Sequence, residues 1–153
     1  MGNDRFVYVT YIRTTPQKLW AALIQPEFTR QYWMGYVQES DWKPEASWQL
    51  TAPDGRITDS GKVVEIDPPR RLVLSWRNEM MPEMSAEGYS RAMFELENRG
   101  DTVKLTVTHE IDKSGSKLIK AVSGGWPIIL ASLKSLLETG ESLKDTRNWP
   151  KGM

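Results

Sequence analysis

The stretch GKVVEIDPPRRLVLSW, residues 61–76, decides the fold class of this chain. Apolar residues recur at every second position on both of its arms: Val64 and Ile66 before the corner, and Leu72, Leu74 and Trp76 after it. A period of two is typical of a strand with one buried face. Asp67-Pro68-Pro69 forms the corner, because proline cannot donate a hydrogen bond to a sheet. The stretch therefore predicts an antiparallel hairpin with one apolar face.

Four further stretches alternate in the same way or have a strand-like composition. They are residues 6–13 (FVYVTYIR), 47–50, 92–97 and 103–110. Turn signals such as Pro53-Asp54-Gly55 separate them, and short turns join antiparallel strands. Both faces of residues 6–13 are apolar, so its inward face does not follow from composition. Together these stretches predict a curved antiparallel sheet of six or seven strands.

Helices are predicted on either side of these strands. Thr15-Pro16 has the residue types of a helix start, and Pro26 ends that helix and begins a second one. Near the C-terminus, leucines and isoleucines at helical spacing predict a long helix over residues 127–139, ending at Gly140. The serine- and glycine-rich segments 114–116 and 123–125 are interpreted as polar loops.

This order of elements predicts one α+β domain over residues 6–140, followed by a tail over residues 141–153. A curved sheet with one apolar face needs cover, and the predicted helices are what the chain offers. A single helix is about 10 Å across, which is too narrow to fill the concave side of such a sheet. Large side chains, a bound ligand or both must close the gap.

Several of these segments resemble one known family. The helix start at residues 15–20, the hairpin over residues 61–76, the strand ending at His109 and the pair Gly125-Trp126 are similar to the heat-shock-protein-90 ATPase activator homologues. The resemblance runs from about Phe6 to Gly140 and places the chain in the START-like (SRPBCC) superfamily. It implies the helix-grip fold, in which a curved antiparallel sheet wraps around a long C-terminal helix, with two short helices after the first strand.

The resemblance implies function only in outline. Members of the superfamily bind lipids, hormones or polyketides in a cavity between sheet and helix, and a few catalyse cyclisation or hydrolysis there. The expected function is therefore binding of a small hydrophobic or aromatic molecule, in a stress or sensing role. One alternative is a cyclase- or hydrolase-type enzyme that uses His109 in the same cavity. A second is a co-chaperone-like module with a protein partner.

Composition narrows the classes of function. Lys plus Arg and Asp plus Glu both number 20, so no net charge favours a nucleic acid or an anionic membrane as partner. No apolar run approaches the roughly 18 residues of a membrane span, so membrane insertion is not expected. The chain has no cysteine and one histidine, so no metal site or cofactor is predicted. The first residues lack the apolar core of a signal peptide, and we expect a cytoplasmic protein.

The seven tryptophans are the conspicuous feature of the composition. Trp48, Trp76 and Trp126 are predicted to converge on the concave side of the sheet, with Trp33 at its mouth. They either fill the core or line a pocket for an apolar ligand. The predicted ligand-binding residues are Trp33, Trp48, Trp76, His109, Trp126, Leu130 and Leu133. The methionine-rich connection over residues 80–84 is interpreted as a long hairpin loop or a flexible lid.

His109 is the one side chain that titrates near neutral pH without help from its neighbours. It shares strand parity with Val107, so we expect it on the inner face, either as a buried structural residue or as a ligand contact. The chain contains no Gly-x-Ser-x-Gly motif, and no residue is predicted to be catalytic. Asp54 and Asp59 lie in or near a turn and, like the other acidic residues, are interpreted as solvated surface charges.

Overall fold

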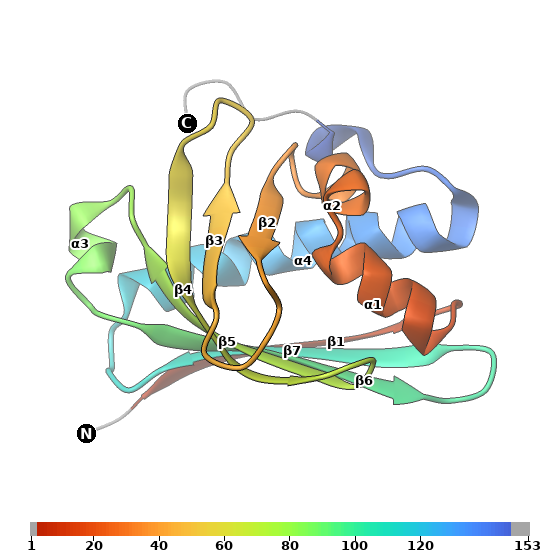
Figure 1. Cartoon of the computed structure of the whole chain (residues 1–153), viewed down its shortest axis with the longest axis horizontal. Helices are drawn as coiled ribbons and strands as arrows, with labels where there is room; N and C mark the ends of the chain where they lie inside the picture. The colour runs from red at the N-terminus through yellow and green to blue at the C-terminus, as the bar shows by residue number, and fades with distance from the viewer. Residues whose placement is uncertain (1–2, 148–153) are drawn as a thin grey trace.

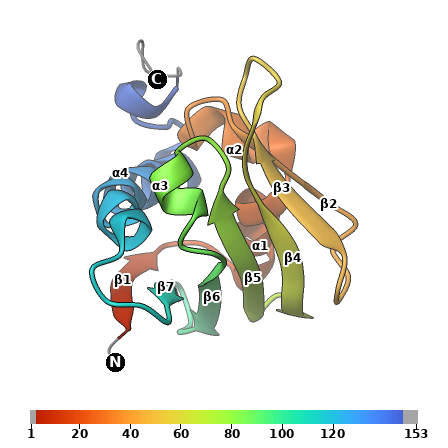
Figure 2. The same ribbon diagram turned by 90° about the vertical axis from the view of Figure 1, so that its left-hand side faces the viewer.

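The structure, a computed structural model, describes residues 3–147. Seven strands form one antiparallel sheet in the order β1-β7-β6-β5-β4-β3-β2. They are β1 (Asp4–Ile12), β2 (Val37–Ser40), β3 (Ser47–Thr51), β4 (Ile57–Asp67), β5 (Arg71–Asn78), β6 (Ser90–Asn98) and β7 (Val103–Ile111). Figures 1 and 2 show the sheet curving around the long helix α4 (Lys117–Thr139). The helix-grip fold predicted from the sequence is confirmed.

Two short helices follow the first strand, as predicted. In α1 (Pro16–Ile24), the Thr15 hydroxyl accepts a hydrogen bond from the backbone N–H of Lys18 at 3.2 Å, and Pro16 occupies the first turn. Both features are typical of a helix N-terminus. Pro26 begins α2 (Pro26–Tyr32), which packs between α1 and α4. A further short helix, α3 (Pro82–Ser85), lies in the connection between β5 and β6.

The C-terminal helix begins ten residues earlier than predicted. It ends at Thr139 before Gly140, whose φ of 86° is the left-handed conformation expected there. Its first residue, however, is Lys117, so residues 123–125 are helical rather than a loop. Glycine and proline both disfavour the interior of a helix. The first half of α4 could therefore not be recognised from the sequence, because it contains Gly124, Gly125 and Pro127.

Two caps explain why α4 nevertheless begins at Lys117. The Ser116 hydroxyl accepts from the N–H of Ile119 at 3.1 Å. The carboxylate of Glu87 accepts from the Lys117 N–H at 2.8 Å and from the Ser116 hydroxyl at 2.6 Å. A negative charge at a helix N-terminus also interacts favourably with the helix dipole. Because Glu87 lies about thirty residues upstream, a local reading of the sequence cannot find this contact.

The side chains of β4 that face the core change their alternation part-way along the strand. Val63 is fully buried and pairs with Leu74, whereas Val64 is exposed, because a bulge shifts the register of β4 between Val63 and Glu65. The prediction that Val64 faces the core is therefore wrong. Ile66, also predicted to face inward, does pack against the core. Such a bulge places one extra residue in a strand and reverses which side chains point inward. On β1, where composition gave no answer, the inward residues are Phe6, Tyr8, Thr10 and Ile12.

The segment predicted as a tail begins as an ordered extension of the domain. The backbone carbonyl of Thr146 accepts from the Met34 N–H at 2.7 Å, and its buried side chain bonds with the Ser132 hydroxyl on α4. Residues 144–146 form a short 3₁₀ turn. The rest of the predicted tail, residues 148–153, lies outside the described residues. The contacts of residues 141–147 therefore help to fix α4 against the loop after α2.

Candidate functional site

A pocket of about 530 Å³ lies at the end of the sheet–helix interface that is nearest α3. Its walls come from four parts of the chain: the strands β3 to β5, the first half of α4, the segment after α2, and the methionine-rich connection before and within α3. Figure 2 shows α3 standing between α4 and β5 on this side of the molecule. The pocket therefore occupies the gap that one helix leaves in a curved sheet.

The walls are mostly apolar. Helix α4 contributes Leu118, Ala121, Val122, Gly125, Trp126 and Ile129. The side near α3 carries three methionines, Met80, Met81 and Met84. Methionine side chains adapt to differently shaped neighbours, which suits the rim of a binding site. Polar lining residues are few: Thr58, Asp59 and Asn78 from the sheet, and Tyr36 from the segment after α2.

Tryptophans form the inner end of the pocket. The rings of Trp33 and Trp76 are nearly parallel, with centroids 6.4 Å apart. Trp126 meets both edge-on, at 5.4 Å from Trp33 and 5.8 Å from Trp76. Both arrangements lie within the range favoured by the charge distribution of aromatic rings. These three rings hold one another in place and present apolar surface to the pocket.

Trp48 lies behind Trp76, with centroids 4.4 Å apart, and is only 1% exposed. Its indole N–H donates to the Gln38 side-chain oxygen at 2.9 Å, and the Gln38 amide donates to the carbonyl of Leu23. A buried indole needs such a partner. Trp48 therefore supports the aromatic cluster from the core and does not line the pocket.

His109 is buried completely and also does not line the pocket. The Ser90 hydroxyl donates its one proton to the carbonyl of Trp76 at 2.9 Å, so Nε2 of His109 donates to Ser90 at 2.8 Å. Nδ1 then accepts from the indole N–H of Trp126 at 3.1 Å. This pattern assigns a neutral imidazole with its proton on Nε2. His109 is thus linked to the pocket through Trp126, whose ring is also held by contacts with Trp33 and Trp76.

Burial lowers the pKa of His109 to about 3. Protonation of Nδ1 would place two N–H donors face to face, since the Trp126 indole already donates there. The imidazole is therefore neutral and fully bonded at neutral pH. A group with both nitrogens engaged and no access to the pocket is poorly placed to transfer protons to a ligand.

Asp59 is the polar residue that the sequence did not reveal. It was interpreted as a surface charge, but it is 7% exposed and lines the pocket. One carboxylate oxygen accepts from the Trp76 indole N–H at 2.8 Å. Burial raises the pKa of Asp59 to about 6, against the opposing effect of hydrogen bonds from Thr58 and Trp76. The interpretation as a solvated charge is wrong because Asp59 lies on β4 opposite Asn78, and its side chain packs under the Trp76 ring edge.

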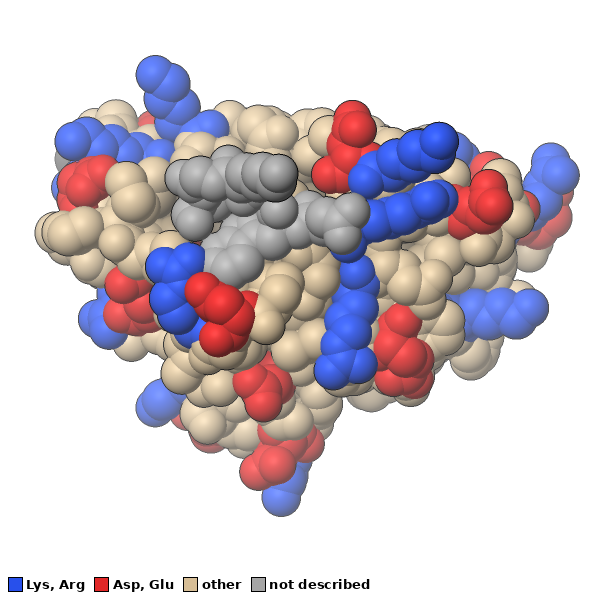
Figure 3. Space-filling view, turned by 90° about the horizontal axis from the view of Figure 1, so that it is seen from above, with Lys and Arg blue, Asp and Glu red and all other residues tan. Residues whose placement is uncertain are grey.

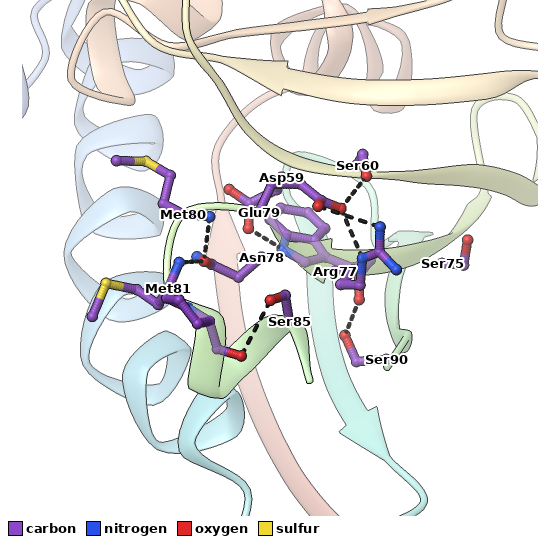
Figure 4. Close-up of polar contacts among 12 residues, drawn as sticks. Asp59, Ser60, Ser75, Arg77, Asn78, Glu79, Met80, Met81, Ser85 and Ser90 are labelled. Atoms are coloured by element: carbon purple, nitrogen blue, oxygen red, sulfur yellow. Dashed lines mark hydrogen bonds and ion pairs between the residues drawn. The ribbon is translucent and has the colours of Figure 1, made fainter. Parts of the chain in front are cut away.

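The loop after β5 is held by its own polar contacts (Figure 4). The side-chain oxygen of Asn78 accepts from the N–H groups of Met80 and Met81, at 2.9 and 2.8 Å. Beside it, Glu79 accepts from the Ser60 hydroxyl and pairs with Arg77. The two bonds to Asn78 hold the backbone at Met80 and Met81, both of which line the pocket.

The predicted ligand-binding residues thus divide into two groups. Trp33, Trp76 and Trp126 line the pocket. Trp48, His109, Leu130 and Leu133 are buried in the core around it and do not reach its surface. Reasoning from the sequence missed the helix residues of the pocket, such as Leu118 and Gly125, because the first half of α4 was not recognised. The methionine cluster at residues 80–84 was a usable signal, and three of its members line the rim.

Charged side chains of both signs are mixed on the upper face of the molecule. In the face seen in Figure 3, Lys and Arg side chains lie interspersed with Asp and Glu side chains and with uncharged areas. Within residues 3–147, no group of three or more histidine, aspartate or glutamate side chains is arranged to hold a metal ion. None of the helices in that range has the length and apolar character of a membrane span.

Comparison with solved structures shows the same architecture. CalU16 from Micromonospora echinospora is 20% identical and has a TM-score of 0.72, with 93% of this chain and 78% of that chain covered. The Aha1 dimer from Colwellia psychrerythraea is 17% identical, with a TM-score of 0.71 and coverage of 91% and 99%. DynU16, a protein of the dynemicin biosynthetic locus, is 18% identical, with a TM-score of 0.76. That match covers 97% of this chain and 51% of DynU16. At these identities the similarity shows the fold alone.

Sequence comparison is more specific about the family. No curated protein matches this sequence significantly. The family model described as activator of Hsp90 ATPase homolog 1-like protein matches residues 13–138, which include α1 to β7 and nearly all of α4. The chain therefore belongs to the activator of Hsp90 ATPase homolog 1-like family, within the START-like superfamily.

Proposed function

We propose that the pocket binds a small hydrophobic or aromatic molecule without transforming it. The observation that carries this proposal is the pocket itself, with three tryptophans at its inner end and three methionines at its rim. Pockets for small molecules are typically about 300–1,000 Å³ and mostly apolar, with a few placed polar groups. A volume of about 530 Å³ falls in the middle of that range.

The two glycines inside α4 support this proposal. An added Cβ at Gly124 or at Gly125 would meet no atom within 4 Å, so internal packing does not require glycine at either position. Glycine in a helix interior costs about 0.5–1 kcal/mol relative to alanine. Gly125 lines the pocket. A glycine there keeps the space open and lets a ligand approach the backbone of α4.

The geometry gives little support to the enzyme alternative that uses His109. That imidazole is neutral, both of its nitrogens are bonded, and it lies behind Trp76 and Trp126. The co-chaperone alternative has no observation in its favour beyond family membership. DynU16, a structural neighbour, belongs to a biosynthetic locus by its description, which is consistent with a small-molecule ligand.

The test compares two leucine variants that differ by one position on α4. Gly125→Leu places a side chain in the pocket, whereas Gly124→Leu places one outside the set of pocket-lining residues. Both changes raise helix propensity by a similar amount. The probe is N-phenyl-1-naphthylamine, an uncharged aromatic dye whose fluorescence rises in apolar surroundings, followed together with the melting temperature.

We expect the wild type and Gly124→Leu to bind the dye and to melt at a higher temperature in its presence, since a ligand of the native state stabilises it. Gly125→Leu should bind at least about tenfold more weakly, which corresponds to about 1.4 kcal/mol. Its melting temperature without dye should be no lower than that of the wild type. Equal binding by the two variants would contradict the proposed site. Absence of binding by the wild type to this dye and to other uncharged aromatics would favour the protein-interaction alternative.

A further inference from the structure

The pocket has one charged side chain in an otherwise uncharged lining. Among the described residues that line it, Asp59 is the only Asp, Glu, Lys, Arg or His. Its carboxylate is 7% exposed and accepts from the neutral indole N–H of Trp76. Within residues 3–147, no Lys, Arg or His side chain forms an ion pair with it. Asp59 is therefore a buried carboxylate that has no counter-ion in the described part of the chain.

Such a group is not what the fold requires at this position. A buried charge without a partner is unfavourable, and buried charges are normally paired. The one contact that the carboxylate makes with Trp76 would be made equally well by the oxygen of an asparagine side chain. Among residues 3–147, therefore, no contact uses the negative charge itself, and a ligand in the pocket could supply its counter-ion.

The tryptophans also favour a ligand that carries a positive charge. The face of an indole ring carries partial negative charge and attracts cations, and protein sites for ammonium groups use such rings. Trp33, Trp76 and Trp126 meet at the inner end of the pocket, where Trp76 also contacts Asp59. The rings and the carboxylate together form a surface of negative potential beside an apolar one.

We infer that the pocket selects hydrophobic molecules that carry a protonated amine, with the ammonium group paired to Asp59 and the apolar part lying between the tryptophans and the methionines. This inference rests on the proposed function and names the ligand class of the same site. Carboxylates such as fatty acids should bind poorly, because their negative charge would be buried beside that of Asp59.

The test uses three ligands with one apolar skeleton and three different polar groups. They are 2-naphthylmethylamine, 2-naphthylmethanol and 2-naphthoate, titrated at pH 8 by isothermal calorimetry. The amine should bind at least about tenfold more tightly than the alcohol, and the carboxylate should bind most weakly. Equal affinity for amine and alcohol would overturn the inference while leaving the proposed function intact. If none of the three binds, the proposed function itself fails.

Two variants identify the carboxylate that is responsible. Asp59→Asn keeps the shape and an acceptor for the Trp76 N–H, and it should remove the preference for the amine while changing alcohol binding by less than about threefold. Glu79→Gln is the matched control. Glu79 is an acid whose charge affects Asp59, but it pairs with Arg77 and Ser60 and does not line the pocket. Loss of the preference in Glu79→Gln, or its persistence in Asp59→Asn, would assign the selectivity elsewhere.

The wild type alone offers a measurement that does not depend on any variant folding well. Burial raises the pKa of Asp59 to about 6, and the charge of Glu79 adds to that shift. At pH 5 about one-tenth of such a group is ionised, so amine affinity should fall about tenfold from pH 8 to pH 5. Arg77 stays charged throughout, and the described lining residues of α4 and of the segment after α2 include no Asp, Glu, Lys, Arg or His. Alcohol affinity should stay constant, and an amine affinity that does not change with pH would contradict the pairing with Asp59.

Discussion

Replacing Asp59 by asparagine should stabilise the native state at neutral and alkaline pH and make no difference in acid. The ordinary pKa of the group is 3.8, and burial raises it to about 6 in the native state. The native state therefore holds the proton more tightly than the unfolded chain, and stability is lost as pH rises from about 4 to above 6. A shift of about two units corresponds to about 3 kcal/mol at pH 8. Asparagine removes this unfavourable term because its side chain stays neutral.

The assay is urea unfolding of both proteins at several pH values from 4 to 8. The quantity of interest is the difference in unfolding free energy between variant and wild type. His109 has the opposite dependence: its pKa is lowered from 6.5 to about 3, so its contribution falls as pH drops below 6.5. Because His109 is present in both proteins, its effect cancels in the difference. A variant that is less stable at pH 8, or a difference that does not change with pH, would refute the reasoning that the charge of Asp59 is kept at the expense of the fold.

Three further substitutions test the structural roles assigned above. His109→Gln should lower the unfolding free energy by about 1–2 kcal/mol, since two buried hydrogen bonds are disturbed, and should change dye binding by less than about threefold. A collapse of binding at unchanged stability would instead support the enzyme alternative. Gly61→Ala should destabilise by about 1–3 kcal/mol, because its Cβ would stand 1.8 Å from the carbonyl oxygen of Ser75, and a neutral effect in urea would show that β4 and β5 separate easily. Glu87→Gln should cost about 0.5–1 kcal/mol at low salt and less at high salt, and equal losses at both would exclude an interaction with the α4 dipole.

The fold could be predicted from the sequence wherever short-range signals decide the structure. Thr15 and the prolines at 16 and 26 fixed the two N-terminal helices, because capping and proline geometry act within one turn. Gly140 marked the end of α4 for the same reason. Period-two alternation identified the central strands. These elements predicted a curved antiparallel sheet with two helices after the first strand and one at the end, and the family resemblance implied the helix-grip fold.

Errors arose where distant residues override a local pattern. The start of α4 depends on Glu87, which is brought there by the β5–β6 connection. The faces of β4 depend on a bulge that no local residue type announces. Both features follow from tertiary pairing, so a window of a few residues could not show them.

The candidate site was predictable in its aromatic part and not in its polar part. Large apolar side chains are usually buried, and strand parity indicates on which face of the sheet they lie. Trp33, Trp76 and Trp126 do meet at the pocket. Asp59 was missed because it stands in a polar stretch near a turn, where exposure is the usual outcome. Its burial depends on the indole of Trp76, a contact between neighbouring strands.

The most direct test of the central claim uses the indole N–H signals of the tryptophans in a ¹⁵N-edited NMR titration with 2-naphthylmethanol. A ligand in the pocket should shift the signals of Trp33, Trp76 and Trp126, which line it, and leave those of Trp20 and Trp42, which do not. Saturation of these shifts at one equivalent of ligand would support a single binding site. Unchanged signals for the three pocket tryptophans, or shifts confined to Trp20 and Trp42, would contradict the account.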